Sequence, residues 1–370
     1  MSGARATSLA RLALLAPLAG CALGGRPGGP PSPDVPFVPG VPWLDTDGRP
    51  IEAHGGGILR VGDTYYWYGE DHHLGGGNKT GIAAYASSDL HAWRRVGVVL
   101  PKDSLPEPFR DRGVAERPKV IHDARRGRYV MWMHLDANRY QEASAGVAVA
   151  DRPEGPFHVV RVFRPVAFDY GYSREEPTLH ERERGNSFRD MALFVDDDGA
   201  GYVFYASESN ATMYAVRLSD DYTDVARPLV KGETWERILP NARREAPAPF
   251  KVGAKYYLIT SGLTGWAPNA ALYHVADRVL GPWTTVGNPV AGPDSATTFG
   301  SQSAFVLSVP RACARCFVFM ADRWEPRALE RSTYLWLPFA VAPDGTIRIE
   351  DRARWTMRTF DALGARRRAP

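Results

Sequence analysis

The sequence has few cysteines and almost no net charge. It carries three cysteines in 370 residues, and 45 basic side chains nearly balance 42 acidic ones, for a formal charge of +3. No basic block is interleaved with aromatic residues, so nucleic acid is not expected as a partner. Hydrophobic residues make up 44% of the chain and aromatic residues 11%, which is enough for a core and excludes an intrinsically disordered protein.

The chain also lacks a long apolar segment near its start. Residues 12–18 are apolar, but this run is too short to span a bilayer as a helix. It follows Arg5 and Arg11 and leads into small residues, which is typical of a secretory signal peptide. The ending Leu-Ala-Gly-Cys at 18–21 resembles a bacterial lipobox, which implies cleavage before Cys21 and acylation of its thiol. An ordinary signal peptide with an incidental cysteine is the alternative.

Three parts of the chain follow from this pattern. We predict a lipoprotein signal peptide over residues 1–20, a Gly/Pro-rich tether over 21–36 and one domain over 37–370. The domain is expected to be exported to the periplasm or the cell surface, and to meet the membrane only through a lipid anchor at Cys21.

The remaining cysteines, Cys313 and Cys316, have CxxC spacing. This spacing is compatible with redox chemistry, half a zinc site or a local disulfide. A second CxxC is absent, so a structural zinc site would lack ligands. Because an exported compartment favours disulfides, we expect a small staple near a turn.

One pattern recurs five times along the chain: an aromatic-rich strand, often preceded by a turn that contains Gly or Asp. The copies lie about 50 to 75 residues apart, at 65–70, 129–134, 202–207, 255–261 and 316–322. No long helical periodicity competes with them. Aromatic and glycine motifs repeated once per unit predict an all-β, five-bladed β-propeller. A β-sandwich or two smaller β-domains are the alternatives, but neither needs the same unit five times.

Acidic and amide side chains flank strands in successive units. They are Glu70, Glu116, Asp190, Glu245 and Gln302. Isolated acids among apolar residues are costly to bury without partners. Three have an adjacent arginine that could serve, namely Arg117, Arg189 and Arg244. Structural ion pairs between blades are the alternative, but equivalent positions in a propeller face one channel, so we interpret the set as a site. Glycosidic cleavage uses paired carboxyl groups, one of them kept protonated.

These residues lie in motifs that resemble glycoside hydrolase family 43, especially its exo-β-1,3-galactanase branch. The resemblance covers about residues 42–338. The motifs that carry it are AHGGG at 53–57, ERPKV at 116–120, RDM at 189–191, REAPA at 244–248, SGLTGW at 261–266, SQS at 301–303 and YLWLP at 334–338. The resemblance implies an inverting, exo-acting galactan 1,3-β-galactosidase that releases terminal galactose from β-1,3-galactan of the arabinogalactan type.

The resemblance also implies catalytic roles. Glu245 matches the general acid, and Asp190 matches the carboxylate that orients this acid and raises its pKa. Most of the family has an Asp base near the start of the first blade, where this sequence has His54 followed by three glycines; the galactanase branch shares that departure. In that branch a glutamine matching Gln302 holds the attacking water. An amide is not a base in its usual form, so water positioning, an imidic tautomer, or Glu116 as the base remain open.

Sugar-binding residues are implied in the same way. The residues that match contacts to the terminal sugar are Glu70, Tyr140, Asn210, Glu236 and Thr264, of which Tyr140 and Glu236 rest on spacing alone. Trp266, Trp67 and Trp324 could provide aromatic walls, although core packing between blades is the alternative for each. His54 is a candidate ligand or base, or a structural residue of the Gly-rich turn.

Two other functions stay open on the sequence. One is an α-L-arabinofuranosidase or β-xylosidase of the same family, which the missing early Asp disfavours. The other is a non-catalytic glycan-binding propeller lipoprotein, which the presence of both Glu245 and Asp190 disfavours. No cofactor is expected, and no obligatory metal, because EF-hand-type spacing is absent.

Overall fold

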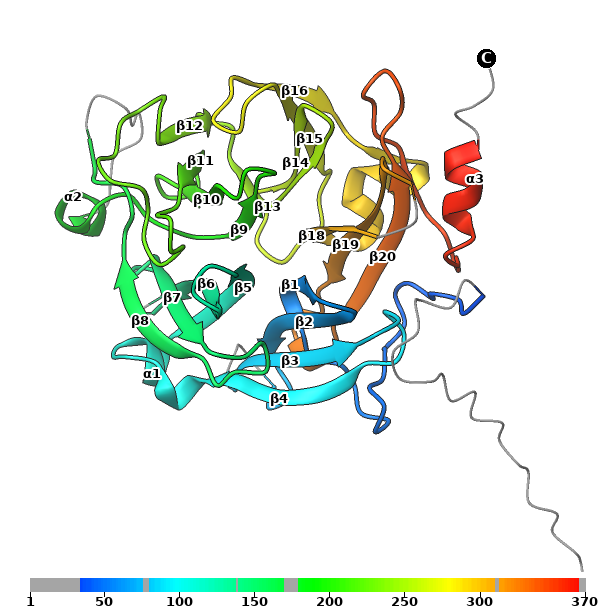
Figure 1. Cartoon of the computed structure of the whole chain (residues 1–370), viewed down its shortest axis with the longest axis horizontal. Coiled ribbons are helices and arrows are strands. Elements are labelled where there is room, and N and C mark those ends of the chain that lie inside the picture. Colours follow the sequence, from blue (N-terminus) through cyan, green and yellow to red (C-terminus); the bar gives the residue numbers. More distant parts are fainter. Residues whose placement is uncertain (1–33, 76–79, 138, 170–178, 310–312, 366–370) are drawn as a thin grey trace, which may run out of the picture.

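The computed structural model describes residues 34–75, 80–137, 139–169, 179–309 and 313–365. It is a five-bladed β-propeller, as the repeats predict (Figure 1). The signal peptide, the lipobox with Cys21 and nearly all of the tether lie outside the described residues. None of the helices within the described ranges is long and apolar enough to cross a membrane.

Each blade is an antiparallel sheet whose strands follow chain order from the axis outward. Blade 1 consists of β1 (His54–Val61), β2 (Thr64–Asp71), β3 (Gly81–Ser87) and β4 (Arg94–Pro101). Blade 2 consists of β5 (Val114–Asp123), β6 (Arg128–Asp136), β7 (Ser144–Ala150) and β8 (His158–Phe163). Blade 3 consists of β9 (Met191–Val195), β10 (Gly201–Ser207), β11 (Thr212–Arg217) and β12 (Trp235–Leu239).

Blade 4 has four strands and blade 5 has three. Blade 4 consists of β13 (Arg244–Val252), β14 (Lys255–Gly262), β15 (Leu272–Ala276) and β16 (Trp283–Gly287). Blade 5 consists of β18 (Gln302–Ser308), β19 (Cys316–Arg323) and β20 (Thr333–Ala340). The first strands β1, β5, β9, β13 and β18 surround the axis in Figure 1. The aromatic strands that repeat in the sequence are the second strands of the blades.

Short elements connect and close the ring. They are η1 (Lys102–Ser104), α1 (Phe109–Arg112), α2 (Leu179–Arg184), η2 (Pro293–Gly300), η3 (Leu329–Arg331), α3 (Thr359–Ala365) and the parallel pair β17 (Val290–Ala291) and β21 (Ile349–Glu350). Phe37 and Trp355 exchange main-chain hydrogen bonds of 2.7 and 3.1 Å, so the start and the end of the described chain are joined. Cys313 and Cys316 form a disulfide at the start of β19, which is the expected one of the three interpretations of their spacing.

The core lies between blades, because both faces of each sheet are covered by a neighbour. Between blades 1 and 5, for example, Trp67 packs edge-on against Trp93 at 5.3 Å between ring centroids and contacts Trp336 at 4.9 Å. All three rings are buried. Trp67 is therefore a core residue, which is the alternative that the sequence left open for it.

Four of the five first strands carry a β-bulge near their N-terminal end. In β5 the pairing jumps from Glu116–His134 to Lys119–Trp132, and in β13 it jumps from Glu245–Ser261 to Ala248–Ile259. Similar shifts interrupt β1 and β18. An extra residue on one strand leaves the ladder locally unpaired and redirects the side chains beside it. Proline donates no main-chain hydrogen bond, and Pro118 and Pro247 occupy two of these bulges.

Glu116 in β5 and Glu245 in β13 are each followed by a residue with a left-handed backbone conformation. Arg117 has a φ of 55° and Ala246 a φ of 53°, which is uncommon for residues other than glycine. In β1 the corresponding position is Gly55, with a φ of 58°. A Cβ at the following Gly56 would lie 1.8 Å from the Tyr68 carbonyl oxygen, so only glycine fits where β1 crosses close to β2.

Candidate active site

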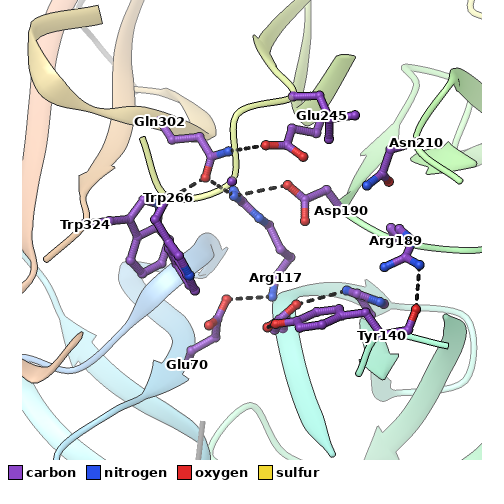
Figure 2. Close-up of a pocket in the computed structure, with 14 residues that line it drawn as sticks. Glu70, Arg117, Tyr140, Arg189, Asp190, Asn210, Glu245, Trp266, Gln302 and Trp324 are labelled. Atoms are coloured by element: carbon purple, nitrogen blue, oxygen red, sulfur yellow. Dashed lines mark hydrogen bonds and ion pairs between the residues drawn. The ribbon is translucent and has the colours of Figure 1, made fainter. Parts of the chain in front are cut away.

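A cavity of about 290 Å³ opens at one end of the propeller axis (Figure 2). All five blades contribute to its wall. The lining residues are Glu70, Glu116, Arg117, His134, Tyr140, Arg189, Asp190, Asn210, Glu245, Leu263, Gly265, Trp266, Gln302 and Trp324. Most of the site residues predicted from the sequence therefore meet in one place. Trp266 and Trp324 form one side, with their rings edge-on at 5.0 Å.

Three predicted site residues lie elsewhere. Glu236 is in the outermost strand β12, where its carboxylate pairs with Lys231 at 3.5 Å. Thr264 is in the loop that carries Trp266, but its hydroxyl is used within that loop, where it donates to the Ala267 carbonyl at 2.6 Å. Neither Glu236 nor Thr264 is among the residues that line the cavity in this structure. For Glu236, which rests on spacing alone, spacing does not say which strand of a blade the residue occupies.

His54 is buried behind the cavity and is not a ligand within it. Its side chain is 0% exposed, its Nδ1 lies 3.1 Å from Asp322 and its Nε2 lies 3.6 Å from Glu52. Burial lowers the pKa of His54, but the hydrogen bonds to Asp322 and Glu52 outweigh burial and raise this pKa to about 9. His54 is a structural cation that links blades 1 and 5, so the structural alternative holds for it.

Glu245 is placed and tuned as a proton donor. It is 8% exposed in the cavity wall. Burial, and secondly the nearby Asp190 carboxylate, raise the pKa of Glu245 to about 8. Asp190, which precedes β9 of blade 3, is linked to the blade that carries Glu245, since its Oδ2 accepts the Ala246 N–H at 3.1 Å. The arrangement places a carboxyl group whose pKa is raised above neutral pH next to a second carboxyl group.

Gln302 has four hydrogen-bond partners. Its Oε1 accepts from the Arg117 guanidinium at 2.6 Å and from the Trp324 indole at 3.0 Å. Its Nε2 donates to Glu245 at 3.0 Å and to the Ser261 hydroxyl at 3.1 Å. Guanidinium and indole groups only donate, so these partners define which end of the amide is oxygen. With both lone pairs of Oε1 engaged, Gln302 in this arrangement orients its neighbours and has no free acceptor for a proton.

Arg117 lies at the centre of the site (Figure 2). Its buried guanidinium binds Gln302, pairs with Asp190 at 3.2 Å and donates to the Ser303 carbonyl at 2.8 Å. Its main-chain N–H donates to Glu70 at 3.0 Å. One residue of blade 2 therefore contacts functional groups from blades 1, 3 and 5. The sequence pattern predicts Arg117 only as a partner for its neighbour Glu116.

The adjacent arginines do not pair with the acids beside them. Arg117 pairs with Asp190, and Arg189 lies 3.5 Å from Asp136. Arg244 donates to the hydroxyl and carbonyl of Thr260 and to the Ala270 carbonyl. Successive residues of an extended chain point to opposite sides, so a neighbour in sequence is seldom the partner in space.

Glu116 and Glu70 are held by histidines. Glu116 lies 3.1 Å from His134 and accepts a hydrogen bond of 2.6 Å from the Tyr140 hydroxyl. Glu70 lies 3.1 Å from His72. The sequence interpretation missed His134 as a site residue, although a signal existed. The repeated aromatic segments at 65–70, 129–134 and 316–322 end at Glu70, His134 and Asp322, and each of these pairs in register with a residue of a first strand.

Asn210 offers an unused acceptor to the cavity. Its Oδ1 is buried and has no hydrogen-bond partner among the described residues. A buried acceptor without a partner costs free energy, of about 1–3 kcal/mol. A ligand hydroxyl that donates to Asn210 would remove this cost, which agrees with a polar ligand.

A carboxyl group with a raised pKa and further carboxylates around one axial cavity are the groups that glycosidic cleavage requires. Residues 52–346 match the family model described as glycosyl hydrolases family 43. This match covers more than half of the chain, and the chain belongs to glycoside hydrolase family 43. The protein is thus a glycosidase that acts on an oligo- or polysaccharide.

Several solved structures are similar. A β-1,3-galactosidase of this family, solved with galactodeoxynojirimycin, is 38% identical with a TM-score of 0.79, covering 86% of this chain and 100% of that one. An exo-β-1,3-galactanase from Clostridium thermocellum is 34% identical with a TM-score of 0.75, covering 86% of this chain and 66% of that one. An exo-β-1,3-galactanase from Phanerochaete chrysosporium, solved with β-1,3-galactotriose, is 33% identical with a TM-score of 0.74, covering 87% and 68%. A β-D-galactofuranosidase from Aspergillus niger is 23% identical over 255 residues, which is 66% of this chain and 68% of that protein.

Proposed function

We propose that this glycosidase is an inverting, exo-acting galactan 1,3-β-galactosidase that releases terminal galactose from β-1,3-galactan. The observation that carries the proposal is the contact between Glu245 and Gln302, because an amide stands beside the acid where most of the family uses an Asp base. The similar structures named as β-1,3-galactosidases and exo-β-1,3-galactanases support the substrate.

In the proposed reaction Glu245 donates its proton to the glycosidic oxygen as the bond to the anomeric carbon breaks. Asp190 remains ionised and holds the Ala246 amide, which fixes the backbone beside the acid. Inverting enzymes leave about 6.5–9.5 Å between acid and base for the sugar and the water. Gln302 lies 3.0 Å from Glu245, so we expect a bound galactosyl unit to separate the two side chains and free Gln302 to hold the attacking water.

The experiment that tests the function is product analysis. The protein is incubated with β-1,3-galactan and, separately, with aryl α-L-arabinofuranosides and aryl β-xylosides. Galactose is expected from galactan alone, and NMR during the first turnovers should show the α-anomer, because inversion converts a β-linkage into α-galactose. Sugar release from the arabinofuranoside or xyloside alone would favour the second hydrolase activity. Galactan binding without release from any substrate would favour the glycan-binding protein.

The rate is expected to fall as the pH rises through about 8. Glu245 acts only when protonated, and its pKa of about 8 means that this form is lost above that pH. The measurement is kcat/KM on β-1,3-galactan across the alkaline range. Asp190→Asn removes the neighbouring negative charge and should move the basic limb to lower pH. A wild-type basic limb near the ordinary carboxyl pKa of about 4.3 would contradict the assignment of the acid.

For the first 36 residues we propose, on the sequence alone, export as a lipoprotein. Residues 1–20 would be removed, Cys21 would be acylated, and residues 21–36 would link a periplasmic or cell-surface domain to the membrane. Labelled palmitate is expected to enter the wild-type protein in a bacterial host, and Cys21→Ala should abolish this labelling. Equal labelling of both proteins would contradict the anchor.

A further inference from the structure

A buried histidine stands behind one of the site carboxylates. His134, in β6, pairs in register with Glu116 of the axial strand β5 and is 1% exposed. Its Nδ1 lies 3.1 Å from Glu116 Oε2, and its Nε2 lies 2.9 Å from Asp136 Oδ2. The Nε2 contact is a hydrogen bond, whereas the Nδ1 contact is an ion-pair distance without hydrogen-bond geometry. A buried imidazole between two carboxylates is stabilised as the imidazolium, because both negative charges favour the protonated ring.

Asp136, the carboxylate on the side of His134 away from Glu116, is held by main-chain N–H groups. Asp136 Oδ1 accepts the N–H groups of Ala137 at 2.8 Å and Glu142 at 2.9 Å. Arg189 adds a second cation 3.5 Å from Asp136 Oδ2. Burial opposes ionisation of Asp136, but the bond from His134 and these other groups lower its pKa overall. Asp136 therefore acts as a fixed anion that keeps His134 charged.

Glu116, the carboxylate that lines the cavity, is contacted on both of its oxygens. Glu116 Oε1 accepts the Tyr140 hydroxyl at 2.6 Å, opposite the His134 contact on Oε2. Tyr140 is held in turn by Arg189, which donates to the Tyr140 carbonyl at 2.6 Å. The hydrogen bond on one oxygen and the ion pair on the other hold the Glu116 carboxylate in one orientation. It still has lone pairs for a ligand hydroxyl, because an ionised carboxylate has about four acceptor sites.

We propose that His134 is a positioning residue whose imidazolium fixes Glu116, ionised and immobile, as the acceptor of a sugar hydroxyl and not as the catalytic base. The proposal rests on the function proposed above and assigns the roles within its binding site. Burial lowers the pKa of His134, but the bonds to Asp136 and Glu116 outweigh burial and raise this pKa to about 9. The imidazolium is therefore retained through neutral pH. Tyr140 also faces Glu116 through its hydroxyl, and the Arg189 guanidinium lies 5.9 Å from the centre of the Tyr140 ring.

The first experiment compares pH profiles of the wild type and His134→Asn on β-1,3-galactan. Without the imidazolium Glu116 loses one of the two groups that hold its carboxylate in place, so it accepts a sugar hydroxyl less well. KM should increase at least about tenfold, the size of one lost charge-assisted contact, with a smaller change in kcat. The wild-type KM should also rise as the pH passes about 9, where the imidazolium loses its proton, and the variant should lack this rise. A purely structural role would lower activity by one factor at all pH values, and parallel profiles would overturn the proposal.

A double-mutant cycle provides the second readout. Glu116→Gln should raise KM without the added pH dependence, and the double variant with His134→Asn should be no worse than Glu116→Gln alone, because His134 acts through Glu116. Additive losses would contradict this. His122→Asn is a matched control, since that histidine stacks on Tyr129 at 4.7 Å and does not line the cavity.

The charge state of His134 is also measurable without activity. In ¹⁵N NMR spectra of the wild-type protein, both ring nitrogens of His134 should keep protonated shifts up to about pH 8, and Glu116→Gln should change the Nδ1 signal. A neutral ring at pH 7 would overturn the proposal. If wild-type protein released no galactose, the proposed function would fail while this result stood. If it released galactose with parallel pH profiles, only the role of His134 would fail.

Discussion

Replacing Glu245 by glutamine is expected to lower kcat on β-1,3-galactan by about 10²- to 10⁴-fold. The leaving group of this substrate is a sugar alkoxide, which departs poorly without a proton. Glutamine keeps the size of the side chain but has no acidic proton. The folded state holds a proton on Glu245 that the unfolded chain releases above its ordinary pKa of 4.5, so wild-type stability falls between about pH 4.5 and 8. The variant lacks this penalty and should unfold at a similar or higher temperature.

A substrate with a better leaving group distinguishes the loss of the proton donor from the loss of correct substrate position. A β-galactoside of dinitrophenol needs no proton, so Glu245→Gln should lose far less rate on that substrate than on galactan. A matched control is Glu236→Gln, because Glu236 lies in β12 and pairs with Lys231, away from the cavity. Its kcat/KM should stay near that of the wild type. Equal losses of the Glu245 variant on both substrates would mean that Glu245 positions the substrate and does not protonate it.

Replacing Gln302 by alanine is expected to lower kcat about 10²-fold or more while KM changes little. The amide has no charge to contribute, so its effect must come from orientation, and a misplacement of about 1 Å can cost that much. An interaction made mainly in the transition state lowers kcat and kcat/KM together. The measurement is steady-state kinetics on galactan oligosaccharides at pH 6.

A variant that removes only one of the hydrogen bonds to the Gln302 amide is the control. Ser261→Ala removes one of the four hydrogen bonds of Gln302 and leaves the bonds to Glu245, Arg117 and Trp324. A single hydrogen bond contributes about 0.5–1.5 kcal/mol, so the loss of rate should be about 10-fold or less. If Gln302→Ala raised KM and left kcat unchanged, Gln302 would be a binding residue and the attacking water would be held by another group.

Much of the fold could be predicted because a propeller repeats. Each aromatic second strand packs against neighbouring blades in the same way, so the same residue types recur at similar intervals. The ring order of the blades then placed Glu116, Asp190, Glu245 and Gln302 around one axis without any knowledge of contacts. Local pattern was sufficient because the repeat itself encodes the long-range arrangement.

The contacts within the site could not be predicted in the same way. Arg117 pairs with Asp190 and Gln302, from blades 3 and 5, and nothing local in the sequence distinguishes these partners from Glu116. Glu236 lies in the outer strand β12 and not in the cavity wall, because spacing carries no information on which strand of a blade a residue occupies. His134 ends a repeated aromatic segment, but a histidine there is not distinguished by the pattern of acids that predicts the site.

The bulges of the first strands separate the fold from the activity. On the C-terminal side of each bulge, side chains alternate to suit the packing between blades. On the N-terminal side, the alternation is offset by one position, and that offset turns Glu116 and Glu245 toward the axis. A chain shortened by a single residue at Pro118 or Pro247 could keep every packing contact of the blade and yet aim its carboxylate at a neighbouring sheet. A single deletion at either bulge is therefore expected to leave a folded propeller without activity.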